Sequence, residues 1–197
     1  MGRVFILICP CLFFLFSCNR TNQQYDKPYF DFDSLVEAQV AELAKAHPTI
    51  NKKSVINGKA DDSSFVPDRV NMANELDVFR QLDLINKPLY KSMYEIRDGE
   101  KDIKSNLLVR TYVSKNPSPI PFVKFYYQPS PLILKKIESV FQEHNPLFDT
   151  RRTLMLAFDD GNGSVLISGY QLHGTQKMIL NDTVHFSVEV SFLSGKH

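Results

Sequence analysis

The sequence predicts an α+β protein in which two N-terminal helices pack on a mainly antiparallel, strongly curved β-meander. Apolar residues recur at helical spacing within residues 32–46 and 67–83. From residue 93 onward, short apolar or alternating runs are separated by turn residues, which is typical of consecutive antiparallel strands. The chain has 197 residues, of which 43% are hydrophobic and 23% charged, so its size and composition fit one globular domain.

Residues 1–17 have the organisation of a secretory signal peptide. Arg3 supplies a positive charge, residues 4–16 are almost entirely apolar, and the small residue Ser17 precedes Cys18. A helix over residues 4–16 would span ~20 Å at 1.5 Å per residue. Because the hydrocarbon core of a bilayer is about 30 Å thick, this run is too short for a transmembrane helix. We therefore predict cleavage of the leader.

The last residues of the leader, Leu15-Phe16-Ser17-Cys18, resemble the bacterial lipobox, although Phe16 is bulkier than the residue usual there. The resemblance implies diacylglycerol on the Cys18 thiol, cleavage between Ser17 and Cys18, and a further acyl chain on the new amino group. Two or more acyl chains give stable membrane anchoring. A plain secreted protein, in which Cys18 stands at this place by chance, is the alternative, and a transmembrane segment is the least favoured reading.

Composition argues against several classes of partner. The net charge is +1 at pH 7, and the basic pairs are scattered among acidic residues, so we predict no nucleic-acid binding. Of the three cysteines, two lie in the leader and the third is Cys18, so no disulfide is expected. Residues 18–29 are polar and irregular and are predicted to be a tether, which leaves residues 30–197 as a single domain.

The first half of the domain predicts helix, hairpin and helix in that order. Residues 32–46 form the first helix, with a capping-box pattern that starts at Ser34. Residues 49–65 form a hairpin around Asn57-Gly58, a favoured two-residue turn. Asp68 then opens the second helix, which we expect to continue to about Asp83.

The second half predicts strands. Asp98-Gly99 is expected to turn between strands 93–97 and 102–114, and residues 121–128 are apolar on both faces, as in a strand covered on both sides. Further strands are predicted at 147–158, 165–173, 176–180 and 183–192. The last of these alternates regularly between apolar and polar residues, which is typical of a half-buried antiparallel strand.

Residues 131–144 fit two structures. Ile133, Ile137 and Phe141 share one face of either a helix or a strand, and Ser130 with Pro131 suits a helix start. We favour the strand.

Five segments carry a resemblance to a known family: the lipobox, residues 29–32, 75–79 and 83–88, and the run 145–170. With the helix-then-meander layout they resemble a family of uncharacterised Bacteroidota-type envelope lipoproteins. The resemblance covers most of the chain after Cys18 and implies location and architecture without an activity. Because residues 19–22 lack the acidic side chains typical of surface lipoproteins in that phylum, it implies an outer-membrane anchor that faces the periplasm.

A search for catalytic and metal-binding patterns finds none that is specific. The nucleophile-elbow, P-loop, His-Glu-x-x-His and Cys-x-x-Cys motifs are absent from the sequence. Asp61-Asp62 and Asp159-Asp160 lie beside predicted turns, where aspartate is common. His173 and His185 could meet across neighbouring strands, but surface histidines are commoner than metal sites. We predict no cofactor, no metal and no enzymatic activity.

Two accounts remain for the many aromatic residues. Ordinary packing of the helices on the sheet explains them and is preferred. The alternative is an open half-barrel that holds an acyl chain, similar to the lipoprotein carriers LolA and LolB. That alternative predicts a cavity lined by Phe122, Phe125, Leu154 and Phe158.

The leading functional hypothesis is therefore a membrane-anchored, non-enzymatic interaction or structural subunit of an envelope complex, with a protein partner. A lipid- or hydrophobe-binding module is the second hypothesis, and an enzyme is the third. Asp182-Thr183-Val184 also matches the short O-glycosylation motif of the same phylum, which makes Thr183 a weak candidate for modification.

Overall fold

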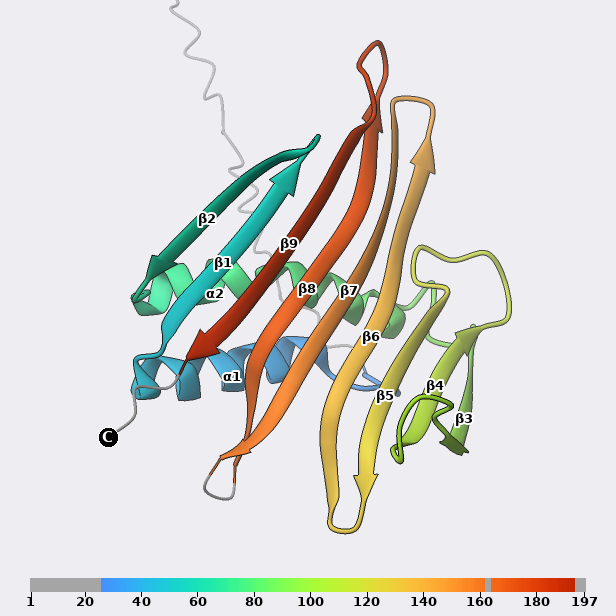
Figure 1. Ribbon diagram of the computed structural model, residues 1–197. Coiled ribbons are helices and arrows are strands. Elements are labelled where there is room, and N and C mark those ends of the chain that lie inside the picture. The colour runs from blue at the N-terminus through green and yellow to red at the C-terminus, as the bar shows by residue number, and fades with distance from the viewer. Residues whose placement is uncertain (1–25, 162–163, 194–197) are drawn as a thin grey trace, which may run out of the picture.

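The computed structural model describes residues 26–161 and 164–193. Within these residues, two α-helices and one 3-10 helix lie on a nine-stranded sheet (Figure 1). The signal peptide, Ser17 and Cys18 lie outside the described residues. In chain order the elements are α1 (Phe32–Ala46), β1 (Thr49–Ile56), β2 (Lys59–Phe65), α2 (Arg69–Leu76), η1 (Asp77–Asn86), β3 (Tyr94–Lys101), β4 (Leu108–Ser114), β5 (Phe122–Pro129), β6 (Leu132–Asn145), β7 (Phe148–Gly161), β8 (Ser164–Met178) and β9 (Val184–Leu193).

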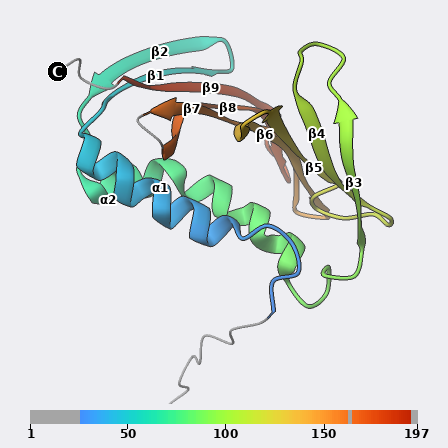
Figure 2. The ribbon, with the colours of Figure 1, turned by 90° about the horizontal axis from the view of Figure 1, so that it is seen from below.

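The strands pair antiparallel throughout, in the order β2-β1-β9-β8-β7-β6-β5-β4-β3. Strands β3 to β9 form the predicted meander, and the predicted hairpin β1–β2 extends the sheet by pairing with β9. The sheet curves around the helices, which cover its concave or inner face and leave the opposite, outer face bare (Figure 2). The α+β prediction is confirmed, and the sheet stays open, with β2 and β3 at its edges.

Helix α1 forms because both of its ends are capped and one face is apolar. The Asp31 carboxylate accepts a hydrogen bond from the Ser34 N–H at 2.9 Å, so Asp31 is the N-cap, three residues before the predicted capping box. His47 ends the helix in a left-handed conformation with φ 45°. The buried face contains Phe32, Val36, Gln39, Val40 and Leu43.

The second predicted helix is divided into two parts. Asp68 caps α2 through the Asn71 N–H at 2.7 Å, and the chain then tightens into the 3-10 helix η1 up to Asn86. The predicted apolar face is present in both parts: it is buried against the sheet and consists of Met72, Leu76, Phe79, Leu82 and Ile85.

The core lies between the inner face and the helices. The burial of successive inner-face residues along β9 shows how far the core reaches. Val190 and Phe192 are buried, whereas Phe186 and Val188 are half-buried and Val184 is exposed. The sequence correctly predicts which residues share a face. It does not predict that the helices cover the C-terminal part of β9 and leave its N-terminal part uncovered (Figure 1).

Two strand predictions are wrong. Asp98-Gly99 is not the turn of its hairpin but a bulge within β3, where the register shifts between Arg97 and Glu100. Gly99 adopts φ 79°, and the Arg110 side chain hydrogen-bonds Asp98, which holds the pKa of that carboxyl below its usual range.

The predicted strands 165–173 and 176–180 are one strand, β8. Gly174 does not interrupt it, because the glycine lets the chain approach β7 and β9 closely. A Cβ atom at this position would lie 2.5 Å from the Arg151 carbonyl oxygen and 2.9 Å from the Phe186 ring. The preference for a strand at 131–144 is confirmed by β6.

Candidate functional site

A shallow groove with a volume of about 470 Å³ crosses the outer face at the end of the sheet that lies uppermost in Figure 1. Three neighbouring strands supply its polar side chains, and their register aligns them in two rows. The rows are Arg151, Thr175 and His185, followed by Thr153, His173 and Ser187. Val55 of β1 lies opposite Ser187 and continues the second row. We call this feature the outer groove.

No acidic side chain lines the outer groove. Arg80, Arg97 and Arg110 each form an ion pair with a carboxylate, whereas Arg151 has no ion pair within the described part of the chain. Asp149 lies one row above and contacts His144 at 3.1 Å, and Glu189 lies one row below. Arg151 also borders a second pocket, which Glu143 and Asp149 line. The groove therefore presents unpaired positive charge among hydroxyl groups.

One contact fixes a side chain in the groove. The Ser187 hydroxyl lies 2.9 Å from Nδ1 of His173. In a neutral ring, a hydroxyl that donates to Nδ1 leaves the proton on Nε2, which then becomes a hydrogen-bond donor to any ligand. A hydrolase would further need a carboxylate on the second ring nitrogen and an oxyanion hole. The described residues supply no such carboxylate, and the pair lies within the regular β8–β9 ladder.

A second feature lies at the same end of the sheet, where the β6–β7 and β8–β9 turns are side by side (Figure 1). The Ile179 N–H donates to the Leu147 carbonyl at 2.9 Å and joins the two turns. Four large apolar side chains are solvent-exposed here: Leu147 (64%), Met178 (50%), Ile179 (56%) and Leu180 (98%). We call these four residues the apolar tip.

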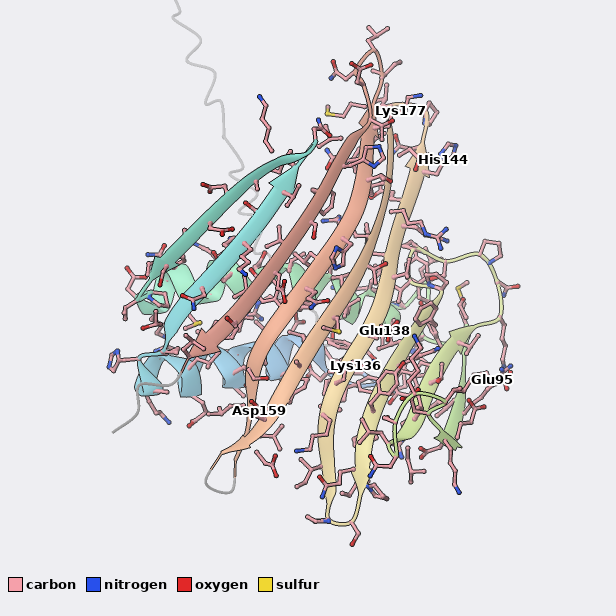
Figure 3. The ribbon with its side chains drawn as sticks, viewed as in Figure 1. Glu95, Lys136, Glu138, His144, Asp159 and Lys177 are labelled. Carbon is pink, nitrogen blue, oxygen red and sulfur yellow. The ribbon has the colours of Figure 1, made fainter. Side chains whose placement is uncertain are left out.

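Leu180 adopts a conformation that favours glycine or asparagine, with φ 64°. The chain therefore holds a fully exposed leucine in a strained backbone position, and such strain is commonest at functional sites. Charged residues of both signs surround the tip. Figure 3 shows His144 and Lys177 beside it, and Asp149 lies opposite Lys177 in the register of β7 and β8.

Three of the four residues predicted to line a cavity lie in the core. Phe125, Leu154 and Phe158 are buried in the core, where the helices pack on the inner face. Phe122 is half-buried, with the Lys124 ammonium 5.4 Å from its ring centroid. None of the four lines either the outer groove or the three further pockets recorded among the described residues.

Thr183 is exposed in the loop that leads into β9. The other sequence candidates are spread over the surface: Asp61 and Asp62 are exposed on the edge strand β2, and Asp160 accepts a hydrogen bond from Lys135.

Three carboxylates come close enough to suggest a metal site, but a lysine occupies their centre. Asp31, Asp33 and Asp83 present oxygens within 4.8 Å of one another. The Lys27 ammonium lies 2.7, 3.0 and 2.9 Å from them respectively. Although burial alone would raise the pKa of Asp31, hydrogen bonds from Lys27 and Ser34 outweigh it and lower that pKa. The cluster therefore ties the segment before α1 to η1.

A partly buried network also holds α2 on the sheet. The Glu75 carboxylate accepts hydrogen bonds from Lys52 at 2.8 Å and from the Tyr170 hydroxyl. Burial and this bond raise the pKa of Tyr170, so the phenol stays neutral. Since all three partners are satisfied and lie beneath α2, the network is structural.

Comparisons with protein-family models, curated proteins and solved structures find no match to this chain. The described helices include none that is long and apolar enough to span a membrane. The apolar tip and the outer groove are the two candidate sites among the described residues. His173 and His185, which could meet across neighbouring strands, lie in adjacent rows opposite Ser187 and Thr175, and Arg151 shares the row of His185.

Proposed function

We propose that this chain is a lipid-anchored, non-enzymatic binding protein of a bacterial envelope, held at the outer membrane on its periplasmic side, which docks a partner protein through the apolar tip. The observation that carries the proposal is the exposure of Leu147, Met178, Ile179 and Leu180 on two adjoining turns. Contiguous exposed apolar surface marks interaction sites in proteins that otherwise bury such residues.

A protein is a better occupant of the tip than a bilayer. Membrane-inserting tips are bordered mainly by lysine and arginine, which meet anionic headgroups. Here Asp149 and the exposed Asp182 accompany Lys177, so the border carries both signs. Mixed charge around an apolar centre is the usual anatomy of a protein–protein interface.

The attachment of the first described residues supports an anchored domain. Lys27 is held by three carboxylates, and the Tyr29 N–H donates to the Asn86 side chain at 3.0 Å. Tyr29, predicted to end the tether, thus packs against the core. The chain from Cys18 to residue 26 can span at most roughly 30 Å at 3.3–3.6 Å per residue. A lipid on Cys18 would therefore keep the domain close to the membrane.

Leu180→Asp should remove the partner without unfolding the domain. The side chain is 98% exposed, so its loss costs the fold little, while a desolvated carboxylate at an interface centre weakens binding by at least tenfold. We would extract the full-length protein gently from its membrane and identify partners by native mass spectrometry after crosslinking.

Ile103→Asp is the matched control, because Ile103 is 100% exposed in the loop between β3 and β4. A partner retained by this control and lost from Leu180→Asp supports docking at the tip. Retention of the same partner by both variants would contradict it.

The anchor is tested separately by Cys18→Ala. We expect complete loss of acyl labelling with radioactive palmitate and transfer of the protein from the membrane to the soluble fraction. Cys11→Ala, which changes a leader cysteine, should leave both readouts unchanged. An acylated Cys18→Ala protein would be inconsistent with lipidation at this position.

The half-barrel carrier remains the second candidate, on one observation. Above the helices, the inner face carries half-buried Phe141, Leu172 and Phe186, and the Nε of Arg152 is buried without a hydrogen-bond partner among the described residues. An acyl chain with its carboxylate on Arg152 would fit that surface. Non-covalent lipid in the native mass spectrum, retained by Leu180→Asp and lost from Arg152→Leu, would favour this candidate.

A further inference from the structure

The outer groove is independent of the apolar tip and of the anchor. It lies on the outer face, whereas the first described residues reach the domain on the helix side (Figure 2). Its polar side chains stand in adjacent rows of the sheet, and the only fixed contact among them is that between Ser187 and His173. Pairs of opposite charge are one of the cross-strand contacts that stabilise exposed rows of a sheet, and the two rows of the groove contain none.

The two rows contain a guanidinium, two imidazoles and hydroxyl groups but no carboxylate, so a negatively charged ligand would complement them. Arg151 stands directly opposite Thr175, which in turn is opposite His185, so a guanidinium, a hydroxyl and an imidazole face the same space. The neighbouring row adds Thr153 and the His173 ring that Ser187 orients. Arginine binds phosphate oxygens through two parallel hydrogen bonds, and hydroxyl and imidazole N–H groups donate to the remaining oxygens.

We infer that the outer groove binds a phosphate monoester through Arg151, His173 and His185. The volume of about 470 Å³ is large enough for the phosphate and the sugar or glycerol that carries it. The phosphate has two sources, a soluble phosphorylated metabolite or the headgroup of a lipid. The inference does not rest on the proposed docking function.

Isothermal titration calorimetry of the full-length protein in detergent tests this site with glucose 6-phosphate, and with glucose as the neutral comparison. We expect heat of binding for glucose 6-phosphate alone. Arg151→Gln should weaken it at least tenfold, since a charge-assisted hydrogen bond is replaced by a neutral one. Arg151→Lys should retain part of the affinity, because the charge stays while the forked geometry is lost. His173→Gln with His185→Gln should also weaken binding.

Arg97→Gln is the matched control. Arg97 lies on the same outer face but pairs with Glu95 at 3.1 Å, and Figure 3 shows Glu95 at the far edge of the sheet. This change should leave the affinity for glucose 6-phosphate unaltered. Thermal unfolding of each variant verifies that Arg151, which is exposed, can be replaced without loss of the fold.

Dihexanoylphosphatidic acid, a short-chain soluble lipid, separates the two sources. Tenfold tighter binding of this lipid than of glucose 6-phosphate assigns the site to a headgroup, and similar or weaker binding assigns it to a soluble phosphate ester. The inference is overturned if neither phosphate ligand binds, or if Arg151→Gln and Arg97→Gln reduce the affinity equally.

Discussion

Phe125→Ala should lower the free energy of unfolding by about 4 kcal/mol, the usual cost of removing a buried aromatic side chain. Phe125 is completely buried, and its ring centroid lies 4.9 Å from that of Phe30, 5.1 Å from Tyr112 and 6.1 Å from Phe32. The ring thus joins β4, β5, α1 and the segment before α1. Denaturation with urea, followed by tyrosine fluorescence or circular dichroism, measures the change.

Phe122→Ala gives the contrast. Phe122 lies on the same strand but is only half-buried, so we expect a loss of about 1 kcal/mol or less from its smaller buried area. The two variants also separate packing from ligand binding. If Phe125 lined an open cavity instead of filling the core, its removal would cost as little as that of Phe122, and equal losses would contradict the packing described here.

The fold class was predictable because its signals are local. Helix α1 was correctly bounded from the spacing of Val36, Val40 and Leu43, and the β1–β2 turn from Asn57-Gly58. Strand β6 was harder, since Ile133, Ile137 and Phe141 are four residues apart and four residues fit both periods. Only the pairing of β6 with β5 and β7 selects the strand, and that pairing is a property of the whole sheet.

The outer groove could not be predicted for the same reason. It depends on the register that puts Arg151, Thr175 and His185 in one row, and register follows from turn positions. The predicted strands 165–173 and 176–180 left a gap at Gly174, which divided β8 and removed the alignment. A glycine inside a strand has a second physical meaning, the close approach of a neighbouring backbone, and this is the one realised here.

The cluster of Asp31, Asp33 and Asp83 around Lys27 could not be predicted from the sequence either, because Asp83 lies far along the chain from the other residues. Its contribution can be measured with Asp83→Ala, which should lower the free energy of unfolding by about 3 kcal/mol, as for other buried ion pairs that lose one partner. The Asp83 side chain is 4% exposed and accepts hydrogen bonds from the Phe32 N–H and the Asn86 amide, both at 3.1 Å. Its removal leaves the Phe32 N–H without this acceptor, and it takes one of three carboxylates from Lys27 and one of two acceptors from the Asn86 amide.

Asp77→Ala is the control, because Asp77 is 74% exposed and its ion pair with Arg80 is long, at 3.6 Å. Its loss should change the free energy of unfolding by less than about 0.5 kcal/mol. Acid provides an independent measurement. Because the pKa of Asp31 is lowered in the folded state, its stabilisation is present above the unfolded pKa of about 3.9 and is lost as pH falls below it. Lys27→Met should weaken that dependence, because it removes the hydrogen bond from Lys27 that lowers the pKa of Asp31. An unchanged acid dependence would mean that Lys27 does not hold the segment before α1 on the domain. The tether would then reach further than the roughly 30 Å derived from the attachment of Lys27.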